Sequence, residues 1–113
     1  MEHTMHLYQH PFDMVIAGTK TIDIRINDTK RRNVKIGDKI KFINLDNENE
    51  HVTVGVVGLM TFDSFWTFYR MVPLVLCGYS EAEVATASPK DMVYYSEKEE
   101  RKNGVVGICF QLL

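Results

Sequence analysis

Alternation of hydrophobic and polar residues along the chain predicts its β-strands. In the segment 20–27, three isoleucines at every second position alternate with polar residues, and a period of two residues is typical of a half-buried strand. Three later segments also have strand-like patterns: 39–45, 51–61 and 105–113. Gly55 and Gly58 interrupt the valine-rich segment 51–61, so we expect a bulge or a tight bend there, as a closing barrel needs.

Hydrophobic residues at helical spacing predict several short helices. The first covers 11–17, with a proline at its start and Gly18 just past its end. Three more are expected after strand 51–61: one capped by Asp63 or Ser64, one opened by a capping box at Ser80, and one opened at Ser88. No linker or repeat divides the chain. We therefore expect a single α+β domain over residues 1–113, with strands curled around a core and helices at one end.

Composition limits the classes of partner. The chain has 113 residues, 45% of them hydrophobic, and a formal net charge of −2, so its total charge does not favour nucleic acid or an anionic membrane. One stretch is nevertheless basic, because it contains Lys30, Arg31, Arg32, Lys35, Lys39 and Lys41. Such a cluster fits phosphate binding, and equally fits a solvated loop of mixed charge.

The cysteines and histidines predict neither a metal site nor a catalytic thiol. Cys77 and Cys109 lie in apolar surroundings without CxxC spacing, and the chain shows neither a signal peptide nor a membrane-spanning run. We expect buried structural thiols in a reduced, cytoplasmic protein. The four histidines lack ligand spacing, and His3 and His6 lie near a terminus that we expect to be loose. No metal and no cofactor is predicted.

Three charged residues of the segment 18–25 are the strongest candidates for a site. Asp23 and Arg25 share one strand face, close enough for the carboxylate to hold the guanidinium. Gly18 can adopt positive φ and turn Lys20 towards them. The three residues form either a site or a solvated ladder of ion pairs. Asp23 favours the charged ammonium of Lys20, which makes Lys20 a better anchor than nucleophile, and Arg25 suits bidentate contact with phosphate or a base edge.

An aromatic run follows the third predicted strand, with residues at 62, 65, 66, 68 and 69. Most of this run fits a core-facing helix surface. Trp66 falls off that surface, so it is a candidate for lining the cleft and stacking on a base.

The pattern Gly18-x-Lys20-x-x-Asp23-x-Arg25, followed by a Gly-Asp turn at 37–38 and a strand, resembles the ASCH domain. The order of elements resembles that family over nearly the whole chain. The resemblance implies the fold of the PUA-like superfamily, a curled β-barrel with short flanking helices. It also implies a cleft lined by Lys20, Asp23 and Arg25 that suits RNA, a nucleotide or a modified nucleoside.

Some members of this family resemble amidohydrolases that remove an acyl group from N4-acetylcytidine. In those enzymes a threonine nucleophile precedes the arginine by two residues, and the lysine activates it. A glutamate from the later helical region completes their site. Here Asp23 occupies the threonine position, and the glutamate position falls near Cys77 and Ser80, with Glu81 and Glu83 nearby. The acyl-enzyme route through a hydroxyl at position 23 is therefore closed.

Two functions remain open at this point. The first is binding of RNA or a nucleotide, with the ligand contacted by Lys20, Asp23, Arg25, Arg31, Arg32 and Trp66. The alternative is an amidohydrolase acting on an acylated or otherwise modified nucleoside, with Lys20 and Asp23 as catalytic residues that activate water. The pattern leaves the oligomeric state open.

Overall fold

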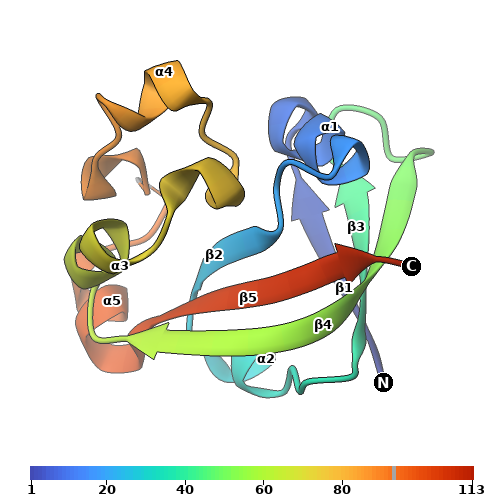
Figure 1. Cartoon of the computed structure of the whole chain (residues 1–113). Helices are drawn as coiled ribbons and strands as arrows, with labels where there is room; N and C mark the ends of the chain where they lie inside the picture. The colour runs from blue at the N-terminus through green and yellow to red at the C-terminus, as the bar shows by residue number, and fades with distance from the viewer. Residues whose placement is uncertain (93) are drawn as a thin grey trace.

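Five strands form one sheet that curls into a half-barrel (Figure 1). The computed structural model describes residues 1–92 and 94–113. The sheet has the order β1-β3-β4-β5-β2, in which β1 runs parallel to β3 and every other neighbouring pair is antiparallel. The strands are β1 (Glu2–Leu7), β2 (Ile22–Ile26), β3 (Lys39–Asn44), β4 (His51–Phe62) and β5 (Val105–Leu112). The predicted α+β class and curled barrel are confirmed.

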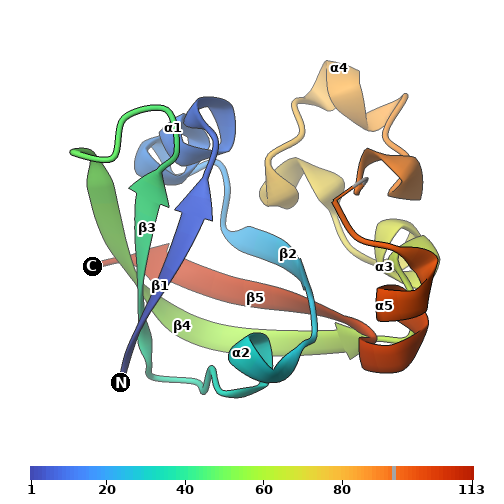
Figure 2. The same ribbon diagram turned by 180° about the vertical axis from the view of Figure 1, so that it is seen from behind.

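The helices are short and gather around the two ends of β2. They are α1 (Gln9–Ala17), α2 (Thr29–Arg32), α3 (Phe65–Met71), η1 (Leu74–Cys77), α4 (Glu81–Val84), η2 (Pro89–Asp91) and α5 (Glu97–Asn103). The elements from α3 to α5 form one insert between β4 and β5. In both ribbon views α1 and this helical insert stand on opposite sides of β2 (Figures 1 and 2).

Most of the predicted helix ends agree with the structure, but α1 begins at Gln9, two residues before the predicted start at Pro11. Gly18 follows α1 with a φ of 81°, in the left-handed region that glycine tolerates. The Ser64 hydroxyl accepts a hydrogen bond from the Thr67 amide at the start of α3. Ser80 and Ser88 both form the expected capping boxes. The helix that Ser88 opens is a single 3-10 turn, shorter than its sequence suggests.

Several elements were not predicted, among them β1, η1 and α5. The N-terminal residues, which we expected to be loose, form β1 and pair with β3 along their whole length. The sequence does not reveal this strand, because only two of its side chains, Met5 and Leu7, are buried. Its parallel pairing also depends on a distant segment of the chain. Helix α5 has no buried residue, so hydrophobic periodicity could not indicate it. Its Glu100 carboxylate accepts a hydrogen bond from the Phe65 amide at 2.7 Å, which fixes α5 against α3.

The predicted bulge lies in β4, where the pairing register with β5 shifts between Val56 and Gly58. Before the shift, Val54 and Val56 pack in the barrel interior; after it, Leu59 packs there, and Met60 faces the helical insert. An extra residue exchanges the two faces of a strand. One strand can therefore serve two separate hydrophobic cores.

Those two cores lie on opposite faces of the sheet. The interior core lies beneath α1 and includes the Phe42–Phe110 pair, whose ring centroids are 5.4 Å apart. The outer core lies beneath the helical insert and contains all three isoleucines of β2. Because the isoleucines face the insert, strand alternation directs Asp23 and Arg25 to the other face of β2.

We expect Gly107→Ala to destabilise the protein. A Cβ at this position of β5 would lie 2.7 Å from the ring of Phe68, which is fully buried and cannot move aside. Overpacking of this kind costs about 1–3 kcal/mol of unfolding free energy. Gly58→Ala is the matched control, because its Cβ would make an ordinary 3.4 Å contact with Cys109. Urea unfolding measures both, and equal midpoints for the two variants would contradict the expectation.

Candidate functional site

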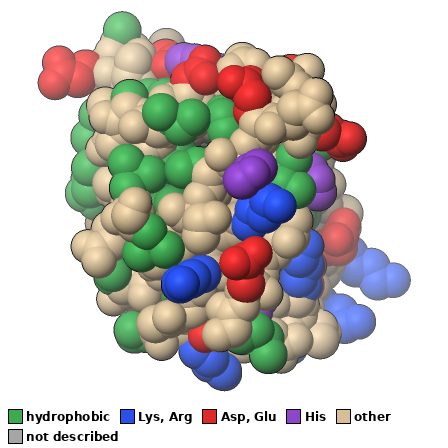
Figure 3. Space-filling view, turned by 90° about the vertical axis from the view of Figure 1, so that its right-hand side faces the viewer, with side chains coloured by type: hydrophobic (Ala, Val, Ile, Leu, Met, Phe, Trp, Pro, Cys, Tyr) green, Lys and Arg blue, Asp and Glu red, His purple; other side chains and the backbone are tan. Residues whose placement is uncertain are grey.

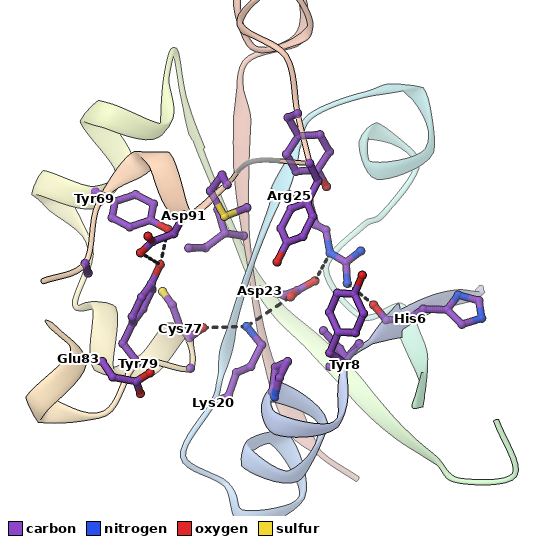
Figure 4. A pocket seen from close by; sticks show the side chains of 18 of the residues that line it. His6, Tyr8, Lys20, Asp23, Arg25, Tyr69, Cys77, Tyr79, Glu83 and Asp91 are labelled. Carbon is purple, nitrogen blue, oxygen red and sulfur yellow. Dashed lines mark hydrogen bonds and ion pairs between the residues drawn. The ribbon is translucent and has the colours of Figure 1, made fainter. Parts of the chain in front are cut away.

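A pocket of about 720 Å³ lies between β2, α1 and the helical insert. Figure 4 shows side chains from these three units and from β1 around it. Its polar lining includes His6, Tyr8, Lys20, Asp23, Arg25, Tyr69, Tyr79, Glu83, Asp91 and Tyr95. The volume falls in the range of pockets that hold small molecules, about 300–1,000 Å³. The structure thus gathers the predicted Lys20, Asp23 and Arg25 on one wall of a cavity.

Asp23 is 3% exposed and lies between two cations. Its Oδ2 is 2.6 Å from Nε of Arg25, and its Oδ1 is 3.3 Å from Nζ of Lys20. Burial acts to raise the pKa of Asp23, but the guanidinium of Arg25 and the ammonium of Lys20 outweigh burial and lower it. Asp23 is therefore an ionised carboxylate at neutral pH and a poor proton acceptor.

Lys20 uses all three of its N–H donors within the protein. Its ammonium is 2.9 Å from the carbonyl of Ile22 and 3.0 Å from the carbonyl of Cys77, in addition to its contact with Asp23. A lysine ammonium has three donors and no acceptor. The residue is 4% exposed, and Gly78, at a φ of 103°, passes close to its side chain. Lys20 therefore fixes Asp23 and the insert, and has no donor left for a ligand.

Of Lys20, Asp23 and Arg25, Arg25 is the one that keeps hydrogen-bond donors unused by the described residues. Its Nε donates to Asp23 and one Nη donates to the carbonyl of His6 at 2.9 Å. Burial acts to lower the pKa of Arg25, but Asp23 raises it more, and the nearby Tyr95 hydroxyl adds to that effect. Of the five guanidinium donors, Asp23 and the carbonyl of His6 occupy two, and the Tyr95 hydroxyl also lies within hydrogen-bonding reach of the guanidinium. The others remain for an oxyanion or a carbonyl in the pocket.

The opposite wall carries a line of hydroxyl groups. The Tyr69 and Tyr79 hydroxyls are 2.6 Å apart, and the Tyr79 hydroxyl donates to Asp91 at 2.8 Å (Figure 4). Burial raises the pKa of Tyr69 to about 12, and burial and these hydrogen bonds raise that of Tyr79 further. Both phenols therefore stay protonated at neutral pH. Their ten-residue separation gives no sequence signal, because only the folding of the insert brings them together.

Cys77 and Glu83, two residues near the position of the enzymes' glutamate, both line the pocket. Burial raises the pKa of the Cys77 thiol to about 12, so it is not a thiolate nucleophile at neutral pH. One Glu83 carboxylate oxygen accepts a hydrogen bond from the Ser80 amide in the capping box. Ser80 and Glu81 are exposed and do not line the cavity.

Three residues predicted to contact the ligand lie outside this pocket. Arg31 and Arg32 belong to α2, which follows the other end of β2, and they line a separate hollow. Trp66 is 61% exposed on α3 and stacks against Arg70, whose guanidinium carbon is 5.8 Å from its ring centroid. The six residues predicted to contact a ligand therefore do not share one pocket. Lys20, Asp23 and Arg25 line the larger pocket, whereas Arg31 and Arg32 lie beyond the other end of β2 and Trp66 lies on α3.

Within the described residues there is no group of three or more histidine, cysteine or carboxylate side chains placed to hold a metal ion. His3 instead pairs with Asp38, with 2.8 Å between Nε2 and Oδ2. No helix formed by those residues is both long and apolar enough to cross a membrane.

Comparison with known proteins gives the family of this fold. A family model described as the ASCH domain matches residues 5–113, so the chain belongs to the ASCH domain family. This family is PUA-like, and its members are often proposed to bind RNA. No curated protein matches the chain.

Solved structures resemble the chain over its whole length. The crystal structure of hypothetical protein PH0355 is 28% identical, with a TM-score of 0.79 and complete coverage of both chains. A Pyrococcus furiosus protein solved by NMR is also 28% identical, with a TM-score of 0.72, covering 100% of this chain and 98% of the other. An ASCH domain from Lactobacillus crispatus is 11% identical, with a TM-score of 0.65 over 98% of this chain and 79% of its own; it supports the fold alone.

We expect Asp23→Asn to destabilise the protein by about 3–5 kcal/mol at neutral pH, because it leaves two buried cations without a counter-charge. Urea unfolding of the purified variant measures this. Asp13→Asn is the control, since Asp13 is exposed on α1 and its replacement changes stability by about 0.5 kcal/mol or less.

Acid should reduce the difference in unfolding free energy between the wild type and Asp23→Asn. The pKa of Asp23 is lowered from 3.8 on folding, so its contribution is complete above that value and is lost as pH falls through the folded-state pKa. The two unfolding curves should therefore converge below pH about 4. A difference that stays constant down to acid unfolding would show that the charge of Asp23 does not stabilise the fold.

Proposed function

We propose that the pocket binds RNA or a nucleotide, with Arg25 as the residue that contacts the ligand directly. The observation that supports this is the difference in how the charged groups of Lys20, Asp23 and Arg25 are engaged. Lys20 and Asp23 have their charged groups engaged with the protein, whereas Arg25 keeps donors directed to the cavity. A guanidinium held in one orientation is suited to a bidentate contact with a phosphate or with the edge of a base.

The shape and lining of the cavity agree with a base. Tyr8, Tyr69, Tyr79, Tyr94 and Tyr95 all line it. Aromatic side chains provide surfaces on which bases stack, at about 1–3 kcal/mol per base. Lys20 and Arg25 face Asp91 and Glu83 across the cavity, so the pocket is not uniformly positive. This mixed lining fits one base with its nearby backbone better than a long run of phosphates.

One face of the molecule and the total charge agree with few phosphate contacts. The face beside β3 and the C-terminus carries interspersed acidic, basic and histidine side chains without one continuous basic area (Figure 3). The formal net charge of −2 gives no general attraction to a polyanion. We therefore propose that few phosphates contribute to binding and that affinity is modest.

Arg25→Ala should weaken the binding of a short single-stranded oligoribonucleotide by about tenfold or more, the loss expected for a bidentate charged contact. Arg25→Lys should restore little of the lost affinity, because a lysine keeps the charge but lacks the paired, coplanar N–H donors of a guanidinium. Arg70→Ala, which removes an exposed arginine from α3, is the matched control and should bind normally.

Fluorescence anisotropy at several salt concentrations measures these affinities. In the wild type, each phosphate contact adds about −0.7 to the slope of log affinity against log salt, so two or three contacts give roughly −1.4 to −2.1. No binding at low salt, or equal losses in Arg25→Ala and Arg70→Ala, would reject this function.

Hydrolysis of an acylated nucleoside is the alternative, and the geometry favours it less. A general base works best with a pKa near the operating pH, whereas ion pairing lowers the pKa of Asp23. The Lys20 ammonium is held by two carbonyls and Asp23 and has no lone pair with which to accept a proton from water. We therefore expect no deacetylation of N4-acetylcytidine above the spontaneous rate, as followed by chromatography. Turnover that disappears in Lys20→Met, with the circular dichroism of the fold retained, would instead favour the enzyme.

A further inference from the structure

A second hollow, of about 200 Å³, is lined by residues of α2 and of the segments beside it. Helix α2 lies at the end of β2 away from α1 (Figure 2). The polar lining of the hollow is Asn27, Arg31, Arg32, Lys35 and Thr61, over an apolar floor of Val34, Leu59 and Val106. We propose that this hollow binds a phosphate group. The site is separate from the pocket around Arg25, and its ligand can be free phosphate or the phosphate of a nucleotide or RNA.

Arg31 provides the first argument. Its Nη1 pairs with the Asp28 carboxylate at 3.1 Å. Its Nε is shielded from solvent and has no hydrogen-bond partner within the described residues, and no hydrogen bond of the described chain uses its Nη2. These two nitrogens form one edge of the guanidinium. Such an edge holds two oxygens of a phosphate with parallel hydrogen bonds. The described residues leave both donors unused, and because Nε is shielded from solvent, the guanidinium must turn towards the hollow for a phosphate to reach it.

Two further cations beside Arg31 lack counter-charges. Arg32 contacts the carbonyl of Asn103 and Lys35 contacts the carbonyl of Arg32, each at 3.4 Å. Neither forms an ion pair with a carboxylate of the described chain. The hollow therefore combines three positive charges with the single negative charge of Asp28, and a dianionic phosphate would offset the excess.

The effect on Lys30 points to the same excess of charge. Burial and the guanidiniums of Arg31 and Arg25 lower the pKa of Lys30, although Asp28 opposes them. Positive charge is thus crowded along the segment after β2. Asn27, which lines the hollow, directly follows the end of β2 and is two residues beyond Arg25.

Arg31 itself gives the direct measurement. We would record the Nε–H resonances of arginines in the 15N-labelled protein during titration with sodium phosphate, holding ionic strength constant with sodium chloride. The chemical shift of the Arg31 Nε–H signal should change along a saturable binding curve. The Nε proton should also exchange more slowly with water, because a phosphate oxygen accepts the hydrogen bond that Nε otherwise lacks. The Arg70 signal, from an exposed arginine, should show neither change.

Variants test which groups carry the affinity. Arg31→Lys keeps the charge but loses the paired donors, so phosphate should bind about tenfold more weakly. The double variant Arg32→Gln with Lys35→Gln should also weaken binding, through the lost charge alone. Lys39→Gln with Lys98→Gln removes two exposed lysines elsewhere and should bind phosphate like the wild type. Unchanged amide spectra in the absence of phosphate confirm folding in each case.

A further titration separates the sources of phosphate. A short oligoribonucleotide that shifts Arg31 at lower concentrations than inorganic phosphate identifies RNA as the source; the reverse order identifies a small phosphate compound. The phosphate titration contains no RNA and reports on Arg31 alone, so failure of the RNA proposal does not affect this test. Non-saturating shifts at Arg31, or equal affinity in Arg31→Lys and the wild type, would overturn the phosphate site.

Discussion

The carboxylate of Asp23, buried between Lys20 and Arg25, is the interaction on which the arrangement of this protein depends. Through Lys20 it connects to the carbonyl of Cys77 in η1, and through Arg25 to the carbonyl of His6 in β1. The line from Cys77 to His6 therefore crosses from the helical insert, through edge strand β2, to the other edge of the sheet. These contacts bridge the side where β1 and β2 are not paired with each other.

This interaction also decides which chemistry the pocket favours. A buried carboxylate between two cations is ionised and weakly basic, and a lysine with three acceptors is held in place. Ion pairs and hydrogen bonds hold these side chains in one position on the wall of the pocket. Such side chains do not give a mobile proton donor or nucleophile. The arginine they orient is pre-organised, so a ligand that it contacts does not have to pay for ordering the side chain. This geometry is the reason that we propose binding, not catalysis, for the pocket.

The two faces of β2 explain why the pocket and the outer core coexist in a chain of this size. Ile22, Ile24 and Ile26 anchor the helical insert on one face, and Asp23 and Arg25 line the cavity on the other. The insert then places its tyrosines opposite Arg25. The bulge in β4 supports the same division, because it allows one strand to contribute to the interior core and then to the outer core.

The sequence by itself determined the features whose causes are local. Alternation over 20–27 fixed the opposite facing of the isoleucines and of Asp23 and Arg25, and serine caps fixed where α3 and α4 begin. Residues with special conformations, such as Gly18, were also recognisable, because positive φ strongly favours glycine. The motif from Gly18 to Arg25 and the order of elements were sufficient to suggest the family.

Only the tertiary structure decided the features that depend on distant segments. The pairing of β1 with β3, the full burial of Asp23 and the Tyr69–Tyr79–Asp91 line all join residues that are separated in the chain or covered by other elements. The same holds for Arg31, Arg32 and Trp66, which local chemistry marks as ligand-binding candidates but which lie away from the Arg25 pocket. Residue type and spacing define what a side chain can do. Which side chains meet is determined by long-range packing, because the sheet and insert must fold before a common cavity exists.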